Sequence, residues 1–187
     1  FSMTNYILMA VLNYQRCWYD FQDAQKRNHW AQFEFDEKNL KIGILGIGHL
    51  GLDAANTLHR LGFEVFGYSN SSKETIFPSF YGNQLTEFLN KINVLVCTVP
   101  LTPKTRGLLS TKLFYMLTNP TYLINVSRGA VHVENDIIRA IEEGKLTGAF
   151  LDVFEKEPLP NNSPLWQNPK IKITPHIASL TYAKESI

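Results

Sequence analysis

A glycine-rich stretch, Lys41-Ile-Gly-Ile-Leu-Gly-Ile-Gly-His-Leu-Gly51, most constrains what this chain can fold into. Residues 42–45 form an apolar run without alternation, which is typical of a parallel strand covered on both faces. Gly46, Gly48 and Gly51 follow with the G-x-G-x-x-G spacing. The first glycine permits a tight turn, the second lets backbone approach a pyrophosphate, and the third lets a helix pack against the strand. The stretch predicts a dinucleotide site more strongly than it predicts a structural glycine turn.

The chain from Lys41 onward alternates between apolar runs of strand length and segments of helical pattern. This alternation predicts an α/β fold with a doubly wound parallel sheet of the Rossmann type and right-handed crossovers. Beyond the first strand, the predicted strands are 63–68, 94–98, 122–126, 147–153 and 171–174, and the predicted helices are 53–61, 84–90, 113–117 and 134–143.

Ligands of such a sheet bind outside the carboxyl ends of the strands, so the residues that follow each strand are informative. Here they are glycines, small polar residues, an arginine, an acid and a histidine, which we expect along one edge. These residues are Gly46 to Gly51, Ser69-Asn70, Val99-Pro100, Ser127-Arg128, Asp152 and Pro175-His176.

The N-terminal region, residues 1–33, is expected to contain one long helix from residue 3 to about residue 30. Its first turns are apolar on most faces, which is typical of a helix buried on more than one side. Either a second copy of the chain, in a homodimer, or another part of the same protein can supply the cover. A polar, acidic linker over 31–39 leads into the dinucleotide-binding domain, which we place at 34–176.

Composition excludes several classes of function. The formal net charge of +1 gives no electrostatic basis for binding nucleic acid or an anionic membrane. No apolar run approaches the ~20 residues that span a bilayer. Cys17 and Cys97 are the only cysteines, and they are far apart, so neither a disulfide framework nor a metal site is predicted. A reducing, cytoplasmic compartment is expected.

Arg128 and His176 are the first candidates for chemistry. The planar guanidinium of Arg128, followed by Gly129, suits a carboxylate, although a structural salt bridge is the alternative. His176 follows Pro175, and a histidine there can exchange a proton with a carbonyl or an alcohol. A capping or core histidine is its alternative.

Two acids follow the fifth predicted strand. A carboxylate of Glu157 beside His176 would favour the protonated imidazole, although its spacing alone is that of a solvated loop acid. Asp152 can accept a hydrogen bond from a nicotinamide amide, or it can cap backbone N–H groups.

Together these motifs resemble the D-2-hydroxyacid dehydrogenase family over nearly the entire chain. Within it, the chain is most similar to the glyoxylate/hydroxypyruvate reductase branch, through Asn13-Tyr-Gln-Arg16, Val131-His-Val-Glu134 and Leu165-Trp-Gln167. The family motifs are Gly46-Ile-Gly-His-Leu-Gly51, Pro100-Leu-Thr-Pro-Lys-Thr105, Asn125-Val-Ser-Arg-Gly-Ala130, Gly148-Ala-Phe-Leu-Asp-Val-Phe154, Glu157-Pro-Leu-Pro160, Ser163-Pro-Leu-Trp166 and Thr174-Pro-His-Ile-Ala178.

The resemblance implies reduction of a small 2-keto acid to the 2-hydroxy acid by hydride transfer from a nicotinamide cofactor, without a metal. Arg128 would hold the substrate, His176 would act as general acid and base, and Glu157 would orient His176. Asp152 would lie near the nicotinamide carboxamide. Further residues expected against the cofactor are His49, Leu50, Thr105, Val126, Ser127 and Ala178.

The identity of the cofactor depends on the end of the second strand. NAD-binding members place an acid there for the ribose 2′-hydroxyl, but Tyr68-Ser-Asn-Ser-Ser-Lys73 contains none. Ser69, Asn70, Ser71 and Lys73 can instead contact a 2′-phosphate. The arginine common in NADP-dependent relatives is replaced by Asn70. We therefore expect NADP(H) to be preferred, with NAD(H) possible.

The resemblance also implies that the chain carries the coenzyme domain, with residues 177–187 returning toward a substrate domain that is largely absent. We expect such a fragment to bind dinucleotide but to turn over poorly. A dinucleotide-sensing module of co-repressor type is the alternative function, since such proteins resemble this family and keep its cofactor site. A dimerisation fragment dominated by the first helix is a third interpretation.

Overall fold

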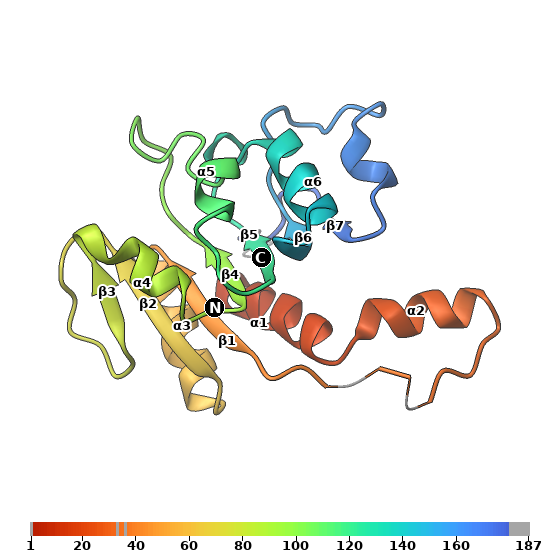
Figure 1. Cartoon of the computed structure of the whole chain (residues 1–187), viewed down its shortest axis with the longest axis horizontal. Coiled ribbons are helices and arrows are strands. Elements are labelled where there is room, and N and C mark those ends of the chain that lie inside the picture. The colour runs from red at the N-terminus through yellow and green to blue at the C-terminus, as the bar shows by residue number, and fades with distance from the viewer. Residues whose placement is uncertain (1, 33, 36, 180–187) are drawn as a thin grey trace, which may run out of the picture.

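The computed structural model describes residues 2–32, 34–35 and 37–179. Its centre is a seven-stranded parallel sheet with the order β3-β2-β1-β4-β5-β6-β7, so the predicted α/β fold is confirmed (Figure 1). The strand order reverses between β1 and β4, which makes their carboxyl ends the expected ligand crevice. The strands are β1 Lys41–Leu45, β2 Glu64–Ser69, β3 Ser79–Tyr81, β4 Val94–Cys97, β5 Thr121–Asn125, β6 Leu146–Leu151 and β7 Ile171–Ile173.

Helices cover both faces of this sheet. They are α1 Ser2–Gln15, α2 Trp18–Lys26, α3 His49–Arg60, α4 Leu85–Leu89, α5 Thr111–Phe114 and α6 Glu134–Glu142, with short 3-10 turns η1 Gly82–Gln84, η2 Gly129–Val131 and η3 Pro164–Gln167. Alternate residues of each central strand enter one of two cores, as the period of two requires. In β4, Val94 and Val96 face the core shared with α1 and α3, whereas Leu95 and Cys97 face the core shared with α4, α5 and α6.

The prediction of one long N-terminal helix was wrong, because the chain forms two helices. Cys17 separates them in a left-handed conformation, with φ of 53°, which a continuous α-helix cannot contain. Ile7 and Val11 of α1 are fully buried within the core shared with α3, while Met9 and Leu12 are about 40% exposed. The fold itself therefore covers the inner side of α1.

Other boundaries differ from the prediction by a few residues. Helix α3 begins at His49, directly after its N-cap Gly48, rather than at residue 53. Strand β3 was not predicted, and it pairs with the end of β2 through only three residues. Of the predicted return segment, 180–187 lies outside the described residues.

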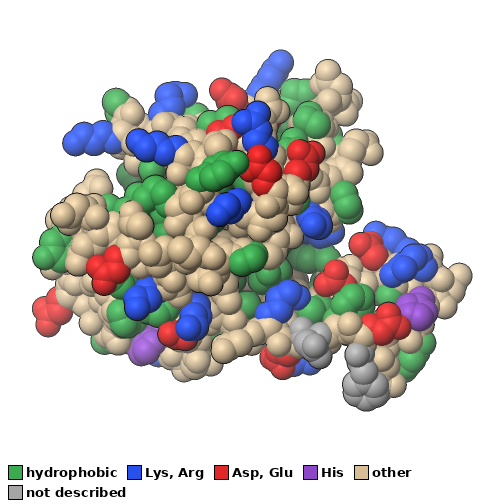
Figure 2. All heavy atoms as spheres, viewed as in Figure 1, with side chains coloured by type: hydrophobic (Ala, Val, Ile, Leu, Met, Phe, Trp, Pro, Cys, Tyr) green, Lys and Arg blue, Asp and Glu red, His purple; other side chains and the backbone are tan. Residues whose placement is uncertain are grey.

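The face shown in Figure 2 carries charged side chains of both signs. Figure 2 shows lysine, arginine, aspartate and glutamate side chains interspersed over this face, and α2 forms a projecting lobe at its lower right. In the part of the chain that the structure describes, no helix combines the length and the apolar character needed to cross a bilayer.

Candidate active site

The glycine turn between β1 and α3 is held against two neighbouring strands. Gly46 has φ of 107°, a conformation that favours glycine, and its N–H donates to the carbonyl of Tyr68 at 2.9 Å. A Cβ on Gly51 would lie 2.2 Å from the carbonyl oxygen of Gly46, so only glycine lets α3 approach the turn this closely. The Thr98 hydroxyl donates to the same carbonyl at 2.7 Å and fixes the turn to the end of β4.

Gly48 has a different role in the turn. A Cβ added to it would meet no heavy atom within 4 Å, so the space beside this backbone is open. The N-terminus of the twelve-residue helix α3 begins at the next residue, His49, and its first N–H groups have no acceptor within the helix. This open backbone at a helix N-terminus fits the pyrophosphate of a dinucleotide.

The end of β2 presents a short polar turn beside the glycine turn. Ser69 closes the strand, and its hydroxyl donates to the carbonyl of Ser71 at 2.6 Å. Asn70, Ser71 and Lys73 are exposed. The structure thus brings the four residues predicted to meet a 2′-phosphate to the sheet edge that carries the glycine turn, and no acidic side chain is among them.

The loop after β4 lies at the switch point of the sheet. Val99 packs against Gly46, where an added Cβ would meet its backbone nitrogen at 2.9 Å. Pro100 follows, and its carbonyl accepts the hydroxyl proton of Thr105 at 2.6 Å. This bond folds the loop back on itself, which places Thr105 beside the start of the loop.

Arg128 follows the end of β5, where hydrogen bonds from the Asn125 side chain fix the preceding backbone. Asn125 is fully buried, and its side-chain oxygen accepts hydrogen bonds from the N–H and the hydroxyl of Ser127. Val126 and Ser127 are buried, whereas Arg128 is exposed. The guanidinium donates to the carbonyl of Ser127 at 2.6 Å, and within residues 2–32, 34–35 and 37–179 no acid forms a salt bridge with it.

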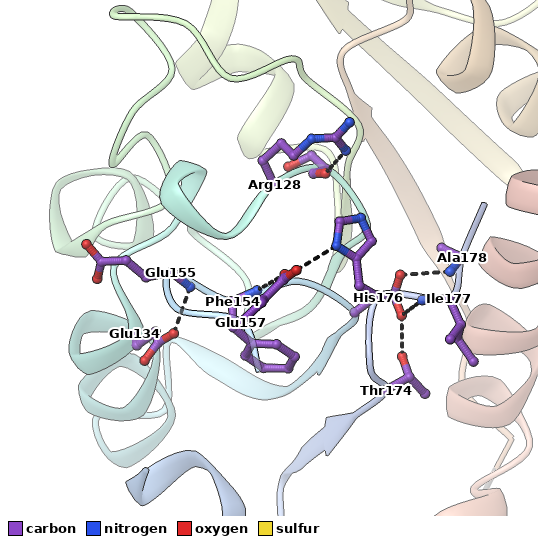
Figure 3. A network of polar contacts seen from close by, with 11 residues as sticks. Arg128, Glu134, Phe154, Glu155, Glu157, Thr174, His176, Ile177 and Ala178 are labelled. Atoms are coloured by element: carbon purple, nitrogen blue, oxygen red, sulfur yellow. Dashed lines mark hydrogen bonds and ion pairs between the residues drawn. The ribbon is translucent and has the colours of Figure 1, made fainter. Parts of the chain in front are cut away.

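Glu157 and His176 are hydrogen-bonded to each other although 19 positions separate them. A carboxylate oxygen of Glu157 lies 2.8 Å from Nδ1 of His176, and the other oxygen accepts the N–H of Phe154 at 2.9 Å. Figure 3 shows the carboxylate between these two groups, with Arg128 on the same side of the sheet edge. Partial burial opposes the charge of Glu157, yet the bonds from His176 and Phe154 outweigh it and lower the pKa of this carboxyl.

Asp152 anchors the turn that carries His176. It is fully buried, and it accepts hydrogen bonds from the hydroxyl of Thr174 and from the N–H groups of Ile177 and Ala178, at 2.6 to 2.9 Å. These bonds hold His176 in a left-handed conformation, with φ of 55°. The structure therefore gives Asp152 the capping role that the sequence left open. Ala178 is buried by the same turn.

Helix α1 also reaches this turn. The hydroxyl of Thr174 donates to Asp152, so the Tyr6 hydroxyl, which contacts the same Thr174 oxygen, is the donor of that bond. Burial is the main reason that the pKa of Tyr6 is raised. Sequence reasoning missed Tyr6 and Thr98, because their partners lie 168 and 52 positions away. It quoted Asn125 only as part of a motif.

A hollow of about 720 Å³ opens beside the acid–base pair. Its lining is mostly apolar and comes from the segment after β6, from η3 and from the end of β7; it includes Leu159, Trp166 and Ile173 together with Glu157 and His176. Two hollows of about 900 Å³ lie away from these residues, one along α2 and one at the amino ends of β1 and β2. Among the described residues, no group of three or more His, Cys, Asp or Glu side chains can hold a metal ion.

The arrangement can perform acid–base chemistry next to a dinucleotide cradle. A histidine paired with a carboxylate can carry a proton to and from an oxygen atom. The exposed guanidinium of Arg128 can bind a carboxylate once it releases the Ser127 carbonyl. The glycine turn, Arg128 and His176 each follow the carboxyl end of a strand of one parallel sheet.

Comparison with known proteins gives the same picture. Residues 8–178 match the sequence profile of the D-isomer specific 2-hydroxyacid dehydrogenase, NAD binding domain. A curated relative, glyoxylate/hydroxypyruvate reductase A of Photorhabdus laumondii, is 43% identical over 183 residues, which cover 96% of this chain and 58% of the relative. The chain therefore spans less than two-thirds of that relative.

Solved structures share the fold closely. The apo form of an NADPH-dependent glyoxylate/hydroxypyruvate reductase from Sinorhizobium meliloti is similar with a TM-score of 0.91 and 34% identity, over 96% of this chain and 73% of that one. A probable 2-hydroxyacid dehydrogenase from Rhizobium etli in complex with NADP, HEPES and L(+)-tartaric acid has a TM-score of 0.91 and 36% identity, over 97% and 59%. A 2-hydroxyacid dehydrogenase from Xanthobacter autotrophicus in complex with NADPH and MES has a TM-score of 0.91 and 37% identity, over 97% and 76%.

Proposed function

The chain belongs to the D-isomer specific 2-hydroxyacid dehydrogenase family, of which it carries the NAD-binding domain, and on this premise we propose that it is the coenzyme-binding part of a 2-keto acid reductase. The expected substrate is glyoxylate or hydroxypyruvate, as in the names of the relatives in Photorhabdus and Sinorhizobium. The single observation that carries the proposal is the hydrogen bond between Glu157 and His176 at the edge that also holds the glycine turn.

The proposed mechanism assigns one task to each side chain. The guanidinium of Arg128 turns outward and binds the carboxylate of the keto acid, which fixes the carbonyl beside His176. Glu157 accepts a hydrogen bond from Nδ1–H of His176 and orients the ring, which leaves Nε2–H to donate to the carbonyl oxygen. The turn from Gly46 to Gly51 would hold the dinucleotide, whose nicotinamide would supply the hydride for the carbonyl carbon. In the oxidation direction His176 takes the hydroxyl proton back.

We further propose that NADP(H) is the preferred cofactor, with NAD(H) possible. The support is the turn after β2, where Ser69, Asn70, Ser71 and Lys73 follow the end of the strand and none of them is acidic. The Sinorhizobium relative is named as NADPH-dependent, and the Rhizobium and Xanthobacter structures contain NADP or NADPH. Lys73 supplies a cation, and the hydroxyls supply neutral donors for phosphate oxygens.

The proposed domain organisation follows from the coverage of the relatives. Residues 34–176 form the dinucleotide-binding domain, and residues 177–187 lead toward a substrate domain outside this chain. Residues 1–33 supply a homodimer contact, for which the exposed Met9, Leu12 and Trp18 of α1 and α2 are available. By this proposal the 187-residue chain alone binds NADPH but reduces glyoxylate poorly.

His176→Ala in the full-length protein tests the proposal. We expect glyoxylate reduction with NADPH to fall by about two to four orders of magnitude, the range for general acid–base groups, while the dissociation constant of NADPH stays within about twofold. A dinucleotide-sensing module would show no reduction of glyoxylate or hydroxypyruvate by the unaltered full-length protein. That result would reject the reductase and favour the sensor.

A further inference from the structure

His132 is a buried histidine that the proposed mechanism does not use. It follows η2, its side chain has no exposed surface, and it lies between the segment that carries Arg128 and helix α6. Its Nε2 atom is buried without a hydrogen-bond partner among the described residues. A buried imidazole with one unpaired nitrogen costs free energy, so its position calls for a physical reason.

One side of the His132 ring is fixed by Asn125. The side-chain oxygen of Asn125 already accepts two hydrogen bonds from Ser127, so its amide nitrogen faces Nδ1 of His132 at 2.8 Å. The amide donates, and Nδ1 must accept. The ring proton is therefore on Nε2. Through Asn125, the His132 ring is connected to Ser127, the residue that precedes Arg128.

The other side of the ring faces Glu134. The Nε2–H group lies 4.0 Å from a carboxylate oxygen of Glu134, which in turn accepts the N–H of Glu155 at 3.1 Å. The facing His132 ring, together with the Glu155 amide, lowers the pKa of Glu134, so this carboxylate stays charged. Figure 3 shows the bond from Glu155 to Glu134 at the start of the segment that leads to Glu157.

The loop after Arg128 and the loop that leads to Glu157, which Asn125, His132 and Glu134 connect, also contact each other directly. A Cβ on Gly129 would lie 1.8 Å from the carbonyl carbon and oxygen of Phe154, so the backbone after Arg128 packs against the backbone that leads to Glu157. Phe154 itself donates to Glu157. A shift of either loop therefore changes the separation between Arg128 and the acid–base pair.

We propose that His132 is a positioning residue that, through Asn125 on one side and Glu134 on the other, sets the separation between Arg128 and the Glu157–His176 pair. This inference rests on the proposed reductase function and deepens it. The His132 side chain has no exposed surface, so we assign it no contact with substrate or cofactor. It joins two loops that must hold the carboxylate and the carbonyl of one small molecule at the same time, where a displacement of about 1 Å can cost 10²-fold in rate.

Two substitutions break the contact between the ring and Glu134 while they leave an acceptor for Asn125 in place. His132→Asn places a side-chain oxygen near the position of Nδ1, so it can still accept from Asn125, but it loses the donor toward Glu134. Glu134→Ala removes the acceptor of Glu155 from a partly exposed side chain, and it serves if His132→Asn fails to fold. His29→Asn, at an exposed histidine, and Glu142→Ala, at the exposed end of α6, are matched controls.

Two readouts are needed. The first is the hydrogen exchange of the Glu155 and Phe154 amides in this chain, which we expect to accelerate about tenfold in both test variants and not in the controls. The second is steady-state kinetics of the full-length protein with glyoxylate and NADPH. There we expect kcat to fall and KM for glyoxylate to rise, each about tenfold, while the NADPH dissociation constant stays within about twofold.

The outcomes are distinguishable. An unaltered protein that does not reduce 2-keto acids would reject the proposed function, and the inference with it. An unaltered protein that is active, with test variants that keep both kinetic constants, would overturn the inference alone. Unchanged exchange at Glu155 would also overturn it. Equal loss of NADPH affinity and turnover would indicate a general structural role and would count against positioning.

Discussion

Glu157 contacts two groups at once: one carboxylate oxygen lies 2.8 Å from Nδ1 of His176, and the other accepts the backbone N–H of Phe154. The carboxylate thereby ties the segment after β6 to the turn after β7. Both side chains are more than one-third exposed, so water screens their interaction. The pair is still oriented, because a backbone bond fixes the acid.

The lowered pKa of Glu157 predicts how this contact depends on pH. A carboxyl whose pKa is lower in the folded than in the unfolded state stabilises the fold above the unfolded value, about 4.3, and loses that contribution as pH falls through the folded value. The unfolding free energy of the unaltered chain should therefore exceed that of Glu157→Gln most at neutral pH, and the difference should shrink below about pH 4.

Urea unfolding between pH 7 and pH 3 measures this difference. A His176→Ala background is the control, because it removes the side chain that bonds to Glu157, so the pH-dependent part of the difference should decrease there. A difference between the chain and Glu157→Gln that grows as pH falls would contradict the assignment.

The geometry of the glycine turn predicts that one alanine substitution lowers the stability of the fold and that another weakens cofactor binding. Gly51→Ala forces a Cβ to within 2.2 Å of the Gly46 carbonyl oxygen, so it should destabilise the fold by about 1–3 kcal/mol. Gly48→Ala meets no protein atom, so it should leave thermal stability unchanged but weaken NADPH binding, because the methyl enters the space of the pyrophosphate. Calorimetry and fluorescence titration measure the two effects. Equal cofactor affinity in Gly48→Ala and the unaltered chain would show that the cofactor does not approach this backbone.

Ser69→Asp tests the cofactor preference. A carboxylate at the end of β2 can accept the ribose 2′-hydroxyl of NADH and repels the 2′-phosphate of NADPH, so the ratio of the two dissociation constants should move toward NADH by about tenfold or more. Thr118→Asp adds the same charge at an exposed position before β5 and should leave the ratio unchanged. Unaltered chain that binds NADH at least tenfold more tightly than NADPH would reverse the proposed preference.

Asp152→Asn tests the anchor of the His176 turn. Asp152 accepts three hydrogen bonds through its two carboxylate oxygens. In asparagine an amide nitrogen replaces one oxygen, and this nitrogen cannot accept a hydrogen bond from the donor that faces it. We expect a loss of about 1–3 kcal/mol in unfolding free energy and a lower turnover in the full-length protein. The exposed Asp23→Asn, which breaks a surface pair with Lys26, is the control. A stable, fully active Asp152→Asn would show that the turn holds His176 without it.

The sequence predicted the central strands well where they are continuous apolar runs, as in β4 with four fully buried residues. It missed β3, since Ser79–Tyr81 is short and only Phe80 is buried. It also missed the break at Cys17, because nothing in the local pattern specifies a left-handed cysteine between two helical segments. Local sequence patterns predict the helices and strands, whereas the break at Cys17 depends on how the two helices pack against the rest of the fold.

The candidate site was predictable to a similar degree. Strand ends gave Arg128, Asp152 and His176, because parallel strands present their carboxyl ends at one edge. The partner of each side chain was not predictable from spacing. Asp152 binds N–H groups 25 and 26 positions later, and His132 was quoted only as part of a motif although it lies between two loops of the site.

The strand order β3-β2-β1-β4-β5-β6-β7 has a consequence for how such a protein can change. The turn after β2 that would select the cofactor and the segments after β5, β6 and β7 that carry Arg128, Glu157 and His176 lie on opposite sides of the switch point. Under the proposed function, a substitution that changes the preference between NADPH and NADH therefore needs no compensating substitution at the proton donor, His176. The sheet keeps the two specificities independently adjustable, for evolution and for engineering alike.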